Sequence, residues 1–391
     1  MQNSKNLYIF TLFSLFSLCL NSCSNGSVSE KSYIRELDLF KDKEEIRILQ
    51  ITDVHWNFGT DFTKEKTYIT ALVKNTQPDL IVSTGDIVLQ GNKITWEHAL
   101  DTLDSFNIPY FLTYGNHEYQ GMYRPTYPYS LMKNRKNCLN KHVDDNIDGE
   151  SNFVINLTDG VKTKYQLYSI DSKNLYRQWD IKISYDVINE SQINWYKKQI
   201  SYANPDVFDG LYNFTKDEEP IPSLVFTHIP LWQIEYAYRL SNGSNNALLG
   251  QINRYSGHEY EDVYSNAPSE LSGTRAWVGY RDSGAFKAFE DMRSTKGVYF
   301  GHDHSNDFAA EYRTQATTSK GKDVPYITLA YGLKTGAGLT SRDKMMGGNL
   351  IKIKSSGDLQ NFRAFQDYVD DYSGGKGFHL EDMFKWDTRQ F

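Results

Sequence analysis

Between residues 44 and 118 the chain repeats one pattern three times: a short apolar run ends in side chains that can bind a metal. The runs lie at 46–52, 80–84 and 110–114, and helix-like segments at 62–74 and 95–106 separate them. This strand and helix order predicts an α/β sheet with parallel neighbours and right-handed crossovers. Because ligands of such sheets bind beyond the carboxyl ends of the strands, the polar side chains should gather at one edge.

The polar clusters that follow the apolar runs contain five of the nine histidines of the chain. The first three clusters are Asp53-Val54-His55, Gly85-Asp86 and Gly115-Asn116-His117-Glu118. Two more follow strand-like runs further on, namely His228 after 223–227 and Gly301-His302-Asp303-His304 after 297–300. A single Asp or His of this kind is more often a turn residue or a structural histidine. Five such clusters, each after a predicted strand, predict a common site instead.

Carboxylate and imidazole side chains suit a pair of divalent cations. Two cations about 3.5–4 Å apart need a bridging anion and several oxygen or nitrogen ligands around them. Strand ends favour such a site, because a rigid sheet fixes the ligands while the following loops stay open to substrate. Glycines at positions 85, 115 and 301 permit the tight turns that this convergence requires. The sequence therefore predicts a two-metal centre.

The five clusters together resemble the calcineurin-like metallophosphoesterase signature, whose blocks are D-x-H, G-D, G-N-H-[D/E], H and G-H-x-H. The resemblance extends over about residues 46–307, and each ligand position of the signature is filled. It implies an α/β fold of four layers, an αββα sandwich with two mixed sheets. Segments 227–230 and 301–307 are most similar to the small branch related to purple acid phosphatases.

The resemblance also implies a role for each residue. It places Asp53, His55 and His304 on the first metal, Asp86 between the metals, and Asn116, His228 and His302 on the second. His117 would contact the phosphate or protonate the leaving oxygen. The implied activity is hydrolysis of phosphate esters by a hydroxide that the metals activate, with a phosphomonoesterase as the first choice. A phosphodiesterase or nucleotide pyrophosphatase stays open, as does a surface lipoprotein that binds a ligand without catalysis.

One position departs from the purple enzymes. Their metal-binding Tyr stands three residues after the bridging Asp, and this chain has Leu89 there. Without a phenolate ligand, no charge-transfer colour is expected. Mn, Zn or Fe(II) is then expected rather than ferric iron.

Residues beside the motifs are candidates for supporting roles around the metal centre. Asn57 is a candidate for substrate contact because it follows the first motif closely. Glu118, Asp303 and Asp307 are candidates for orienting the ligand imidazoles, with a surface turn as the alternative. The Gly-rich segment 331–338 carries a Lys but lacks the Walker spacing, so a plain loop is predicted there.

The first residues resemble a bacterial lipoprotein signal. Lys5 precedes an uncharged run at 7–20, which is too short to cross a bilayer because a spanning helix takes about 20 apolar residues. Cleavage before Cys23 would leave a lipidated N-terminus, and a plain secretory signal is the alternative. We therefore expect a signal peptide at 1–22, a tether at 23–43 and an exported protein anchored to a membrane at the periplasmic face or cell surface.

The remaining residues, 44–391, are expected to form one metallophosphoesterase domain with insertions near 120–149 and 232–279. The net charge of -7 provides no basic surface for a nucleic-acid polymer. A small phosphate ester is compatible with this charge, because bound metals add local positive charge. Of the three cysteines only Cys138 would stay free, so no intrachain disulfide is expected.

Overall fold

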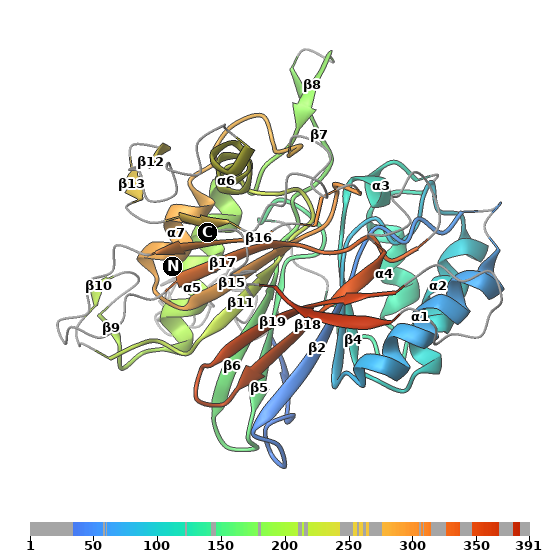
Figure 1. Ribbon diagram of the computed structural model, residues 1–391, viewed down its shortest axis with the longest axis horizontal. Helices are drawn as coiled ribbons and strands as arrows, with labels where there is room; N and C mark the ends of the chain where they lie inside the picture. The colour runs from blue at the N-terminus through green and yellow to red at the C-terminus, as the bar shows by residue number, and fades with distance from the viewer. Residues whose placement is uncertain are drawn as a thin grey trace, which may run out of the picture.

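Two large sheets pack face to face in the computed structural model of the chain (Figure 1). The structure describes residues 34–57, 59, 61–121, 123–141, 146–178, 181–209, 213–214, 218–242, 253–255, 258–260, 263–265, 276–304, 306–307, 309–313, 326–336, 346–366 and 378–383. The predicted signal and Cys23 lie outside these residues. Within them, no helix combines the length and the apolar character that crossing a membrane requires.

One sheet has the strand order β20-β19-β18-β2-β3-β4 in the described residues. Its strands are β2 (Glu45–Ile51), β3 (Leu80–Thr84), β4 (Tyr110–Thr113), β18 (Gly347–Lys354), β19 (Leu359–Phe365) and β20 (His379–Asp382). β2, β3 and β4 run parallel, whereas β18 runs antiparallel to β2. The sheet is therefore mixed, and its two halves come from opposite ends of the chain.

The other sheet has the order β1-β5-β6-β11-β15-β17-β16-β14. Its strands are β1 (Ile34–Leu37), β5 (Phe153–Thr158), β6 (Thr163–Ser169), β11 (Ser223–Phe226), β14 (Val263–Ser265), β15 (Thr295–Phe300), β16 (Ala309–Arg313) and β17 (Tyr326–Tyr331). β6, β11, β15 and β17 are parallel neighbours, and β16 is antiparallel to β17. This sheet is mixed as well.

Most of the helices cover the outer faces of the two sheets (Figure 1). The described helices are α1 (Phe62–Thr76), α2 (Lys93–Ser105), α3 (Asn116–Tyr119), α4 (Thr126–Met132), α5 (Glu190–Ala203), α6 (Trp232–Asn242) and α7 (Ala285–Asp291). A hairpin of β7 (Leu175–Gln178) and β8 (Ile181–Tyr185) projects from the body, and the short strands β9 (Phe208–Asp209), β10 (Asn213–Phe214), β12 (Asn253–Tyr255) and β13 (His258–Tyr260) lie apart from both sheets.

Alternation along the buried strands builds three apolar layers. In β3, Val82 faces the other sheet and packs in the same cluster as Phe226 of β11. Its neighbour Ile81 points the opposite way and packs with Leu100 of α2. A third cluster joins the outer face of the eight-stranded sheet to α5 and α7. Because successive side chains of a strand point to opposite faces, an uninterrupted apolar run fits a strand buried on both faces.

Side-chain caps fix where the main helices begin. The carboxylate of Asp61 accepts hydrogen bonds from the amides of Thr63 and Lys64 at the start of α1. Asn92 accepts from the amide of Thr95 in α2. These caps satisfy amides that have no partner within the helix and set the direction in which each helix leaves its strand.

The predicted α/β fold with mixed sheets is confirmed. The first three apolar runs form the parallel neighbours β2, β3 and β4, and the segments between them form α1 and α2. The two later predicted strands, at 223–227 and 297–300, are found as β11 and β15. The two sheets with their outer helices are the αββα arrangement that the motifs implied.

Part of the predicted tether belongs to the fold. Ile34–Leu37 forms β1, which pairs in parallel with β5 over its whole length. The strand was hidden in the sequence because two adjacent charged residues, Arg35 and Glu36, interrupt its apolar pattern and because it lies at a sheet edge. The predicted insertions contain α4 and α6, and much of 232–279 lies outside the described residues. The domain boundaries and insertions stay predictions.

Candidate metal centre

Four residues of the predicted centre have left-handed backbone conformations directly after their strands. The φ angles are 53° at Asp53, 58° at His55, 51° at Asp86 and 79° at His302. Residues with a Cβ adopt this conformation rarely, and each costs on the order of 1 kcal/mol or more unless its surroundings impose it. The turns aim side chains from β2, β3 and β15 into the same space. Such strain at converging polar residues is typical of a functional site.

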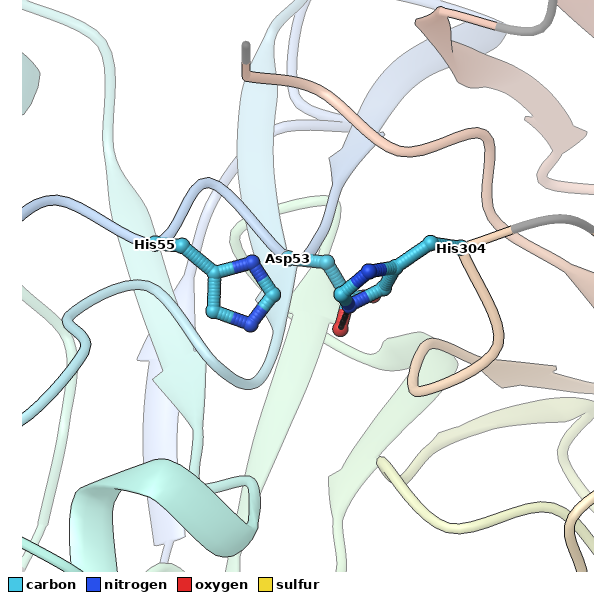
Figure 2. Close-up of side chains that lie close together, drawn as sticks. All are labelled: Asp53, His55 and His304. Carbon is cyan, nitrogen blue, oxygen red and sulfur yellow. Dashed lines mark ion pairs between the residues drawn. The ribbon is translucent and has the colours of Figure 1, made fainter. Parts of the chain in front are cut away.

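The first ligand group consists of Asp53, His55 and His304, whose side chains converge from two loops (Figure 2). Their candidate ligand atoms lie within 4.8 Å of one another. Nε2 of His304 is 3.5 Å from Oδ1 of Asp53. Oδ1 of Asp53 and Nε2 of His55 are buried and have no hydrogen-bond partner among the described residues. A buried carboxylate oxygen in this state calls for a cation.

The second ligand group consists of Asp86, His228 and His302, with Asn116 beside it. Nε2 of His228 lies 3.2 Å from Oδ2 of Asp86, 3.1 Å from Oδ1 of Asn116 and 3.3 Å from Nδ1 of His302. Nδ1 of His228 is 2.7 Å from the carbonyl oxygen of Thr84, to which it donates. In the neutral imidazole, Nε2 then carries a lone pair toward the carboxylate and amide oxygens.

Asp86 lies between the two groups. Its Oδ2 atom is 3.5 Å from Nε2 of His55 and 3.2 Å from Nε2 of His228. Its other oxygen, Oδ1, accepts a hydrogen bond of 2.8 Å from the amide of His117. One carboxylate thus contacts a predicted ligand of each metal and is held in place by the backbone. This is the position that a bridging ligand needs.

The pKa shifts of the site residues also indicate that its carboxylates favour a positive charge nearby. Burial lowers the pKa of His228, but the carboxylates of Asp86 and Asp53 outweigh burial and raise it to about 10. Burial would raise the pKa of Asp86, yet the charge and hydrogen bond of His228 hold it well below its usual range. Burial lowers the pKa of His55 to about 4 and that of His302 to about 3. These imidazoles are neutral and available as ligands at neutral pH.

The donor set fits a pair of divalent cations. Ligands bonded at about 2.1 Å around a tetrahedral ion lie about 3.4 Å apart, and the contacts of Asp86 with His55 and His228 are close to this value. Imidazole, carboxylate and amide oxygens suit Mn, Fe and Zn, whereas no thiolate is present among the described residues of the site. The structure thus brings together the seven residues that the sequence predicted as ligands.

Two glycines keep the centre open for these side chains. A Cβ atom at Gly115 would lie 2.3 Å from Oδ1 of Asp86. A Cβ atom at Gly301 would lie 2.1 Å from Oγ1 of Thr52 and 2.7 Å from Oδ2 of Asp53. All three distances are shorter than the contacts that real Cβ atoms make. The glycines of the motifs are therefore required by close approach as well as by turn geometry.

Glu118 holds the backbone of the bridging loop. Its two carboxylate oxygens accept hydrogen bonds from the amides of Asp86 (2.9 Å), Ile87 (2.9 Å), Val88 (3.3 Å) and Gly115 (2.7 Å). The predicted role of orienting an imidazole is thus replaced by another. Glu118 binds backbone amides of the loops after β3 and β4 and so fixes the positions of both strand ends.

Sequence reasoning missed Lys334. The segment containing it was predicted to be a plain loop, but the side chain of Lys334 is buried beside the first ligand group. Its ammonium donates to the carbonyl of Asp53 and lies 3.3 Å from Nδ1 of His55. The next residue, Thr335, exchanges backbone and side-chain hydrogen bonds with Thr52. The signal available in the sequence was a Lys inside an otherwise apolar and Gly-rich stretch.

The other candidates beside the motifs make local contacts. Oδ2 of Asp303 accepts hydrogen bonds from the amide of Trp277, the amide group of Asn306 and the hydroxyl of Tyr331, so it anchors loops. Burial raises the pKa of Asp303 to about 6.

The backbone carbonyl of Asp307 accepts a hydrogen bond from Arg363. Oδ1 of Asn57 accepts one of 2.8 Å from the amide of Gly59, which closes a turn after the first motif. The predicted contact of Asn57 with substrate stays a prediction.

The calcineurin-like phosphoesterase family matches residues 46–306 of this chain. Two relatives from Arabidopsis thaliana are named probable inactive purple acid phosphatase 14 and probable inactive purple acid phosphatase 29. Each is 24% identical to this chain. The match with the first covers 76% of this chain and 74% of the relative, and the match with the second covers 79% of both chains.

Solved structures with a similar fold include a dimetal phosphatase from Danio rerio, which is 11% identical with a TM-score of 0.45 and covers 86% of this chain and 99% of its own. The structure of PhoD is 10% identical with a TM-score of 0.46 and covers 87% of this chain and 69% of its own. The residues that match the family, the two mixed sheets and the converging motif side chains all agree with the same family. The chain belongs to the calcineurin-like phosphoesterase family.

Proposed function

We propose that this protein hydrolyses phosphomonoesters at a centre of two divalent cations. The observation that carries the proposal is the position of Asp86, whose Oδ2 atom lies within 3.5 Å of His55 and of His228. These imidazoles belong to different ligand groups, so a single carboxylate connects the two. A centre built around a shared carboxylate suits phosphoryl transfer, in which charge on the equatorial oxygens must be neutralised.

The two side-chain groups support the following ligand sets. Asp53, His55 and His304 would hold the first cation, with Asp86 shared. Asn116, His228 and His302 would hold the second. When bound, the cations supply positive charge to the phosphoryl oxygens and activate the attacking water. Mn, Fe or Zn suits this mixture of nitrogen and oxygen donors.

His117 is proposed to protonate the leaving oxygen. Its side chain keeps 22% of its surface exposed, whereas the Asp86 side chain beside it is 2% exposed. Nε2 of His117 lies 3.8 Å from Oδ2 of Asp86, so the ring borders the centre on its accessible side. The backbone amide of His117 is bonded to the same carboxylate, which fixes the start of α3 relative to the ligands. An imidazole placed at the edge of the ligand cluster can reach a substrate oxygen.

Two alternatives compete with a phosphomonoesterase. The same core serves phosphodiesters, because the surrounding loops decide which substrate fits. The plant relatives are named phosphatases, which supports monoesters, but their names also carry the word inactive. A protein that binds a ligand without turnover is therefore the second candidate. The complete ligand set of this chain supports catalysis over binding alone.

Hydrolysis of p-nitrophenyl phosphate and bis-p-nitrophenyl phosphate in the presence of Mn tests the proposal. We expect turnover of the monoester to exceed that of the diester, and a chelator to abolish both. Asp86→Asn should bind less metal and lose on the order of 10³-fold in kcat/KM, because several kcal/mol of charge stabilisation depend on the shared ligand. Wild-type turnover in this variant would refute the proposed centre, and faster diester hydrolysis would select the phosphodiesterase.

We further propose that the protein is exported and anchored to a membrane through a lipid on Cys23. The support is the sequence pattern alone: a positively charged start, an uncharged run at 7–20 and Cys23 three residues after the end of that run. Expression of the full chain with radiolabelled fatty acid tests this proposal. Label should be found in the wild type and be absent from Cys23→Ser. Equal labelling of both proteins would contradict lipidation at this residue.

A further inference from the structure

A wall of tyrosine rings stands next to the second ligand group. The ring of Tyr185, at the end of β8, meets the ring of His302 edge to face, with centroids 4.2 Å apart and planes at 82°. Tyr176 of β7 stacks on Tyr280, with centroids 3.8 Å apart and planes at 13°. We call these three residues, Tyr176, Tyr185 and Tyr280, the aromatic wall. All three are partly exposed, and none belongs to the apolar clusters between the described sheets and helices.

Backbone bonds fix the aromatic wall relative to the centre. The amide of Tyr280 donates to the carbonyl of Tyr185 at 2.9 Å, which joins the hairpin to the segment 276–281. At the other end of that segment, the amide of Trp277 donates to the carboxylate of Asp303, the residue after His302. The aromatic wall is therefore tied to the loop that carries a predicted metal ligand.

A second hydrogen bond connects the aromatic wall to α3, the helix that carries the proposed general acid His117. The side-chain amide of Gln120, which follows α3, donates to Oδ1 of Asn174 at 2.9 Å. Asn174 directly precedes β7, and its carbonyl accepts a bond of 3.0 Å from the amide of Asp186 after β8. The base of the hairpin thus lies between α3, where His117 is found, and the loop of His302. Figure 1 shows the hairpin extending outward from this place.

We propose that the aromatic wall binds the leaving group of the substrate and that this group carries a planar aromatic or heteroaromatic ring. The inference rests on the proposed function, because it assumes that a phosphoryl group occupies the metal centre. The rest of such an ester must extend out of the centre. Tyr185 lies directly beside His302, and Tyr280 is joined to Tyr185 through its backbone amide. Partly exposed rings gain about 0.5–1.5 kcal/mol from an aromatic partner beyond the area that they bury.

Chemistry at the edge of the wall suits such a ligand. Nε of Arg281 donates to the hydroxyl of Tyr280 at 2.9 Å, and its guanidinium lies 5.4 Å from the ring centroid of the same tyrosine. The nearby indole of Trp277 is 57% exposed, a large apolar surface for a single residue. Aromatic rings with an arginine beside them form stacking surfaces that accept planar ligands through either π face.

Binding of two non-hydrolysable phosphonates to the metal-loaded protein tests the proposal without turnover. Phenylphosphonate and cyclohexylphosphonate have the same charge and similar size, but only the first has a planar ring. Isothermal titration should show phenylphosphonate binding about 10-fold more tightly to the wild type, which corresponds to about 1.4 kcal/mol. Tyr185→Leu and Tyr280→Leu should each reduce this preference to about twofold or less and leave metal stoichiometry unchanged.

Tyr202→Leu is the matched control, because Tyr202 is an exposed tyrosine (44%) on α5. This variant should retain the preference for phenylphosphonate. Equal binding of both phosphonates by the wild type would overturn the proposal, as would an unchanged preference in both wall variants or no binding of either compound. A failure of the proposed function would look different. The protein would then bind phenylphosphonate more tightly than cyclohexylphosphonate but hydrolyse no phosphate ester.

Discussion

Nζ of Lys334 lies 3.3 Å from Nδ1 of His55 and also donates to the carbonyl of Asp53. A buried amine thus contacts two residues of the first ligand group. Burial lowers the pKa of Lys334 to about 8, and the carboxylates of Asp53, Glu65 and Asp86 act in the opposite direction. The lysine supplies positive charge to a region in which acidic oxygens otherwise face one another.

Replacing Lys334 by Met should destabilise the metal-free protein more than the metal-loaded protein. Without metal, the variant leaves the carbonyl of Asp53 without this donor and removes positive charge next to the carboxylates, at a cost of about 1–3 kcal/mol. Bound cations would supply that charge instead. Thermal unfolding with a chelator and with added Mn measures the difference. Lys352→Met is the control, because the Lys352 side chain is 25% exposed and pairs with Glu45 at 3.8 Å. Equal destabilisation of Lys334→Met in both conditions would contradict the argument.

Adding one methyl group at Gly115 should weaken metal binding without removing a ligand. The Cβ atom would lie 2.3 Å from Oδ1 of Asp86 and 2.9 Å from Cδ2 of His228, so both side chains must shift. Gly115→Ala should lose about 10- to 100-fold in metal affinity, the range seen when ligand orientation is disturbed. Gly121→Ala is the control, since its nearest contact would be an ordinary 3.6 Å. Similar metal titrations for the two variants would show that close approach at Gly115 is unimportant.

Glu118→Gln should loosen the bridging loop. The glutamine amide group would turn its own N–H donors toward backbone amides that now donate to the carboxylate, including those of Asp86 and Gly115. We expect a loss of about 2–4 kcal/mol in the free energy of unfolding and weaker metal binding. Chemical unfolding and metal titration measure both. Glu97→Gln, at a partly exposed position in α2, should change neither quantity. Wild-type stability of Glu118→Gln would rule out the proposed anchoring.

The buried thiol of Cys138 gives a pH dependence with a defined sign. Burial raises the pKa of Cys138 to about 12, from a usual value of 9.0. Below pH 9 the thiol is protonated in both states and its contribution to stability is complete. Between pH 9 and 12 the unfolded state loses the proton first, so stability falls as pH rises.

Unfolding measured from pH 8 to 11 in wild type and Cys138→Ala should therefore show a shallower decline in the variant. Other groups that titrate in this range contribute equally to both proteins, so the difference isolates the thiol. A parallel pH dependence would contradict the raised pKa. In the native wild type, Cys138 should also react slowly with a thiol reagent at pH 8, because its thiol is buried and protonated.

Iron loading should leave the protein without a charge-transfer colour. Leu89 stands three residues after Asp86, and its amide donates to the carbonyl of Trp56 at 2.8 Å within the turn. An aliphatic side chain there supplies no phenolate to a ferric ion. Visible absorbance of the iron-loaded, air-oxidised protein checks this expectation. An intense visible band that is lost on reduction would show that another tyrosine binds the metal.

The ligands could be predicted from the sequence because each follows a strand directly. A residue such as Asp86 ends an apolar run, and the carboxyl ends of parallel strands share an edge, so sequence order alone brings it near Asp53. Lys334 does not directly follow an apolar run in this way, so the same argument could not find it. Its place depends on contacts between segments far apart in the chain. Thr335 is hydrogen-bonded to Thr52, and the following strand β18 pairs with β2 from Asn349↔Gln50 to Lys354↔Glu45.

The aromatic wall was hidden for a related reason. Tyr176 and Tyr185 lie in a hairpin outside both sheets, and Tyr280 belongs to a loop that follows a long stretch of polar and aromatic residues. No periodic pattern connects them, since their contacts are set by hydrogen bonds between loops. Sequence periodicity indicates which residues are buried against a sheet or a helix. These three tyrosines pack in neither way, so periodicity could not find them.

The antiparallel contact of β18 with β2 has a consequence for how the protein matures. Until β18 docks, β2 has an open edge, Lys334 and Thr335 are absent from the turn after β2, and the first cation would find an incomplete set of contacts. Synthesis delivers the C-terminal segment last. Ion loading is therefore postponed until the final strands have docked, and the ions available at that moment decide which metal the protein carries.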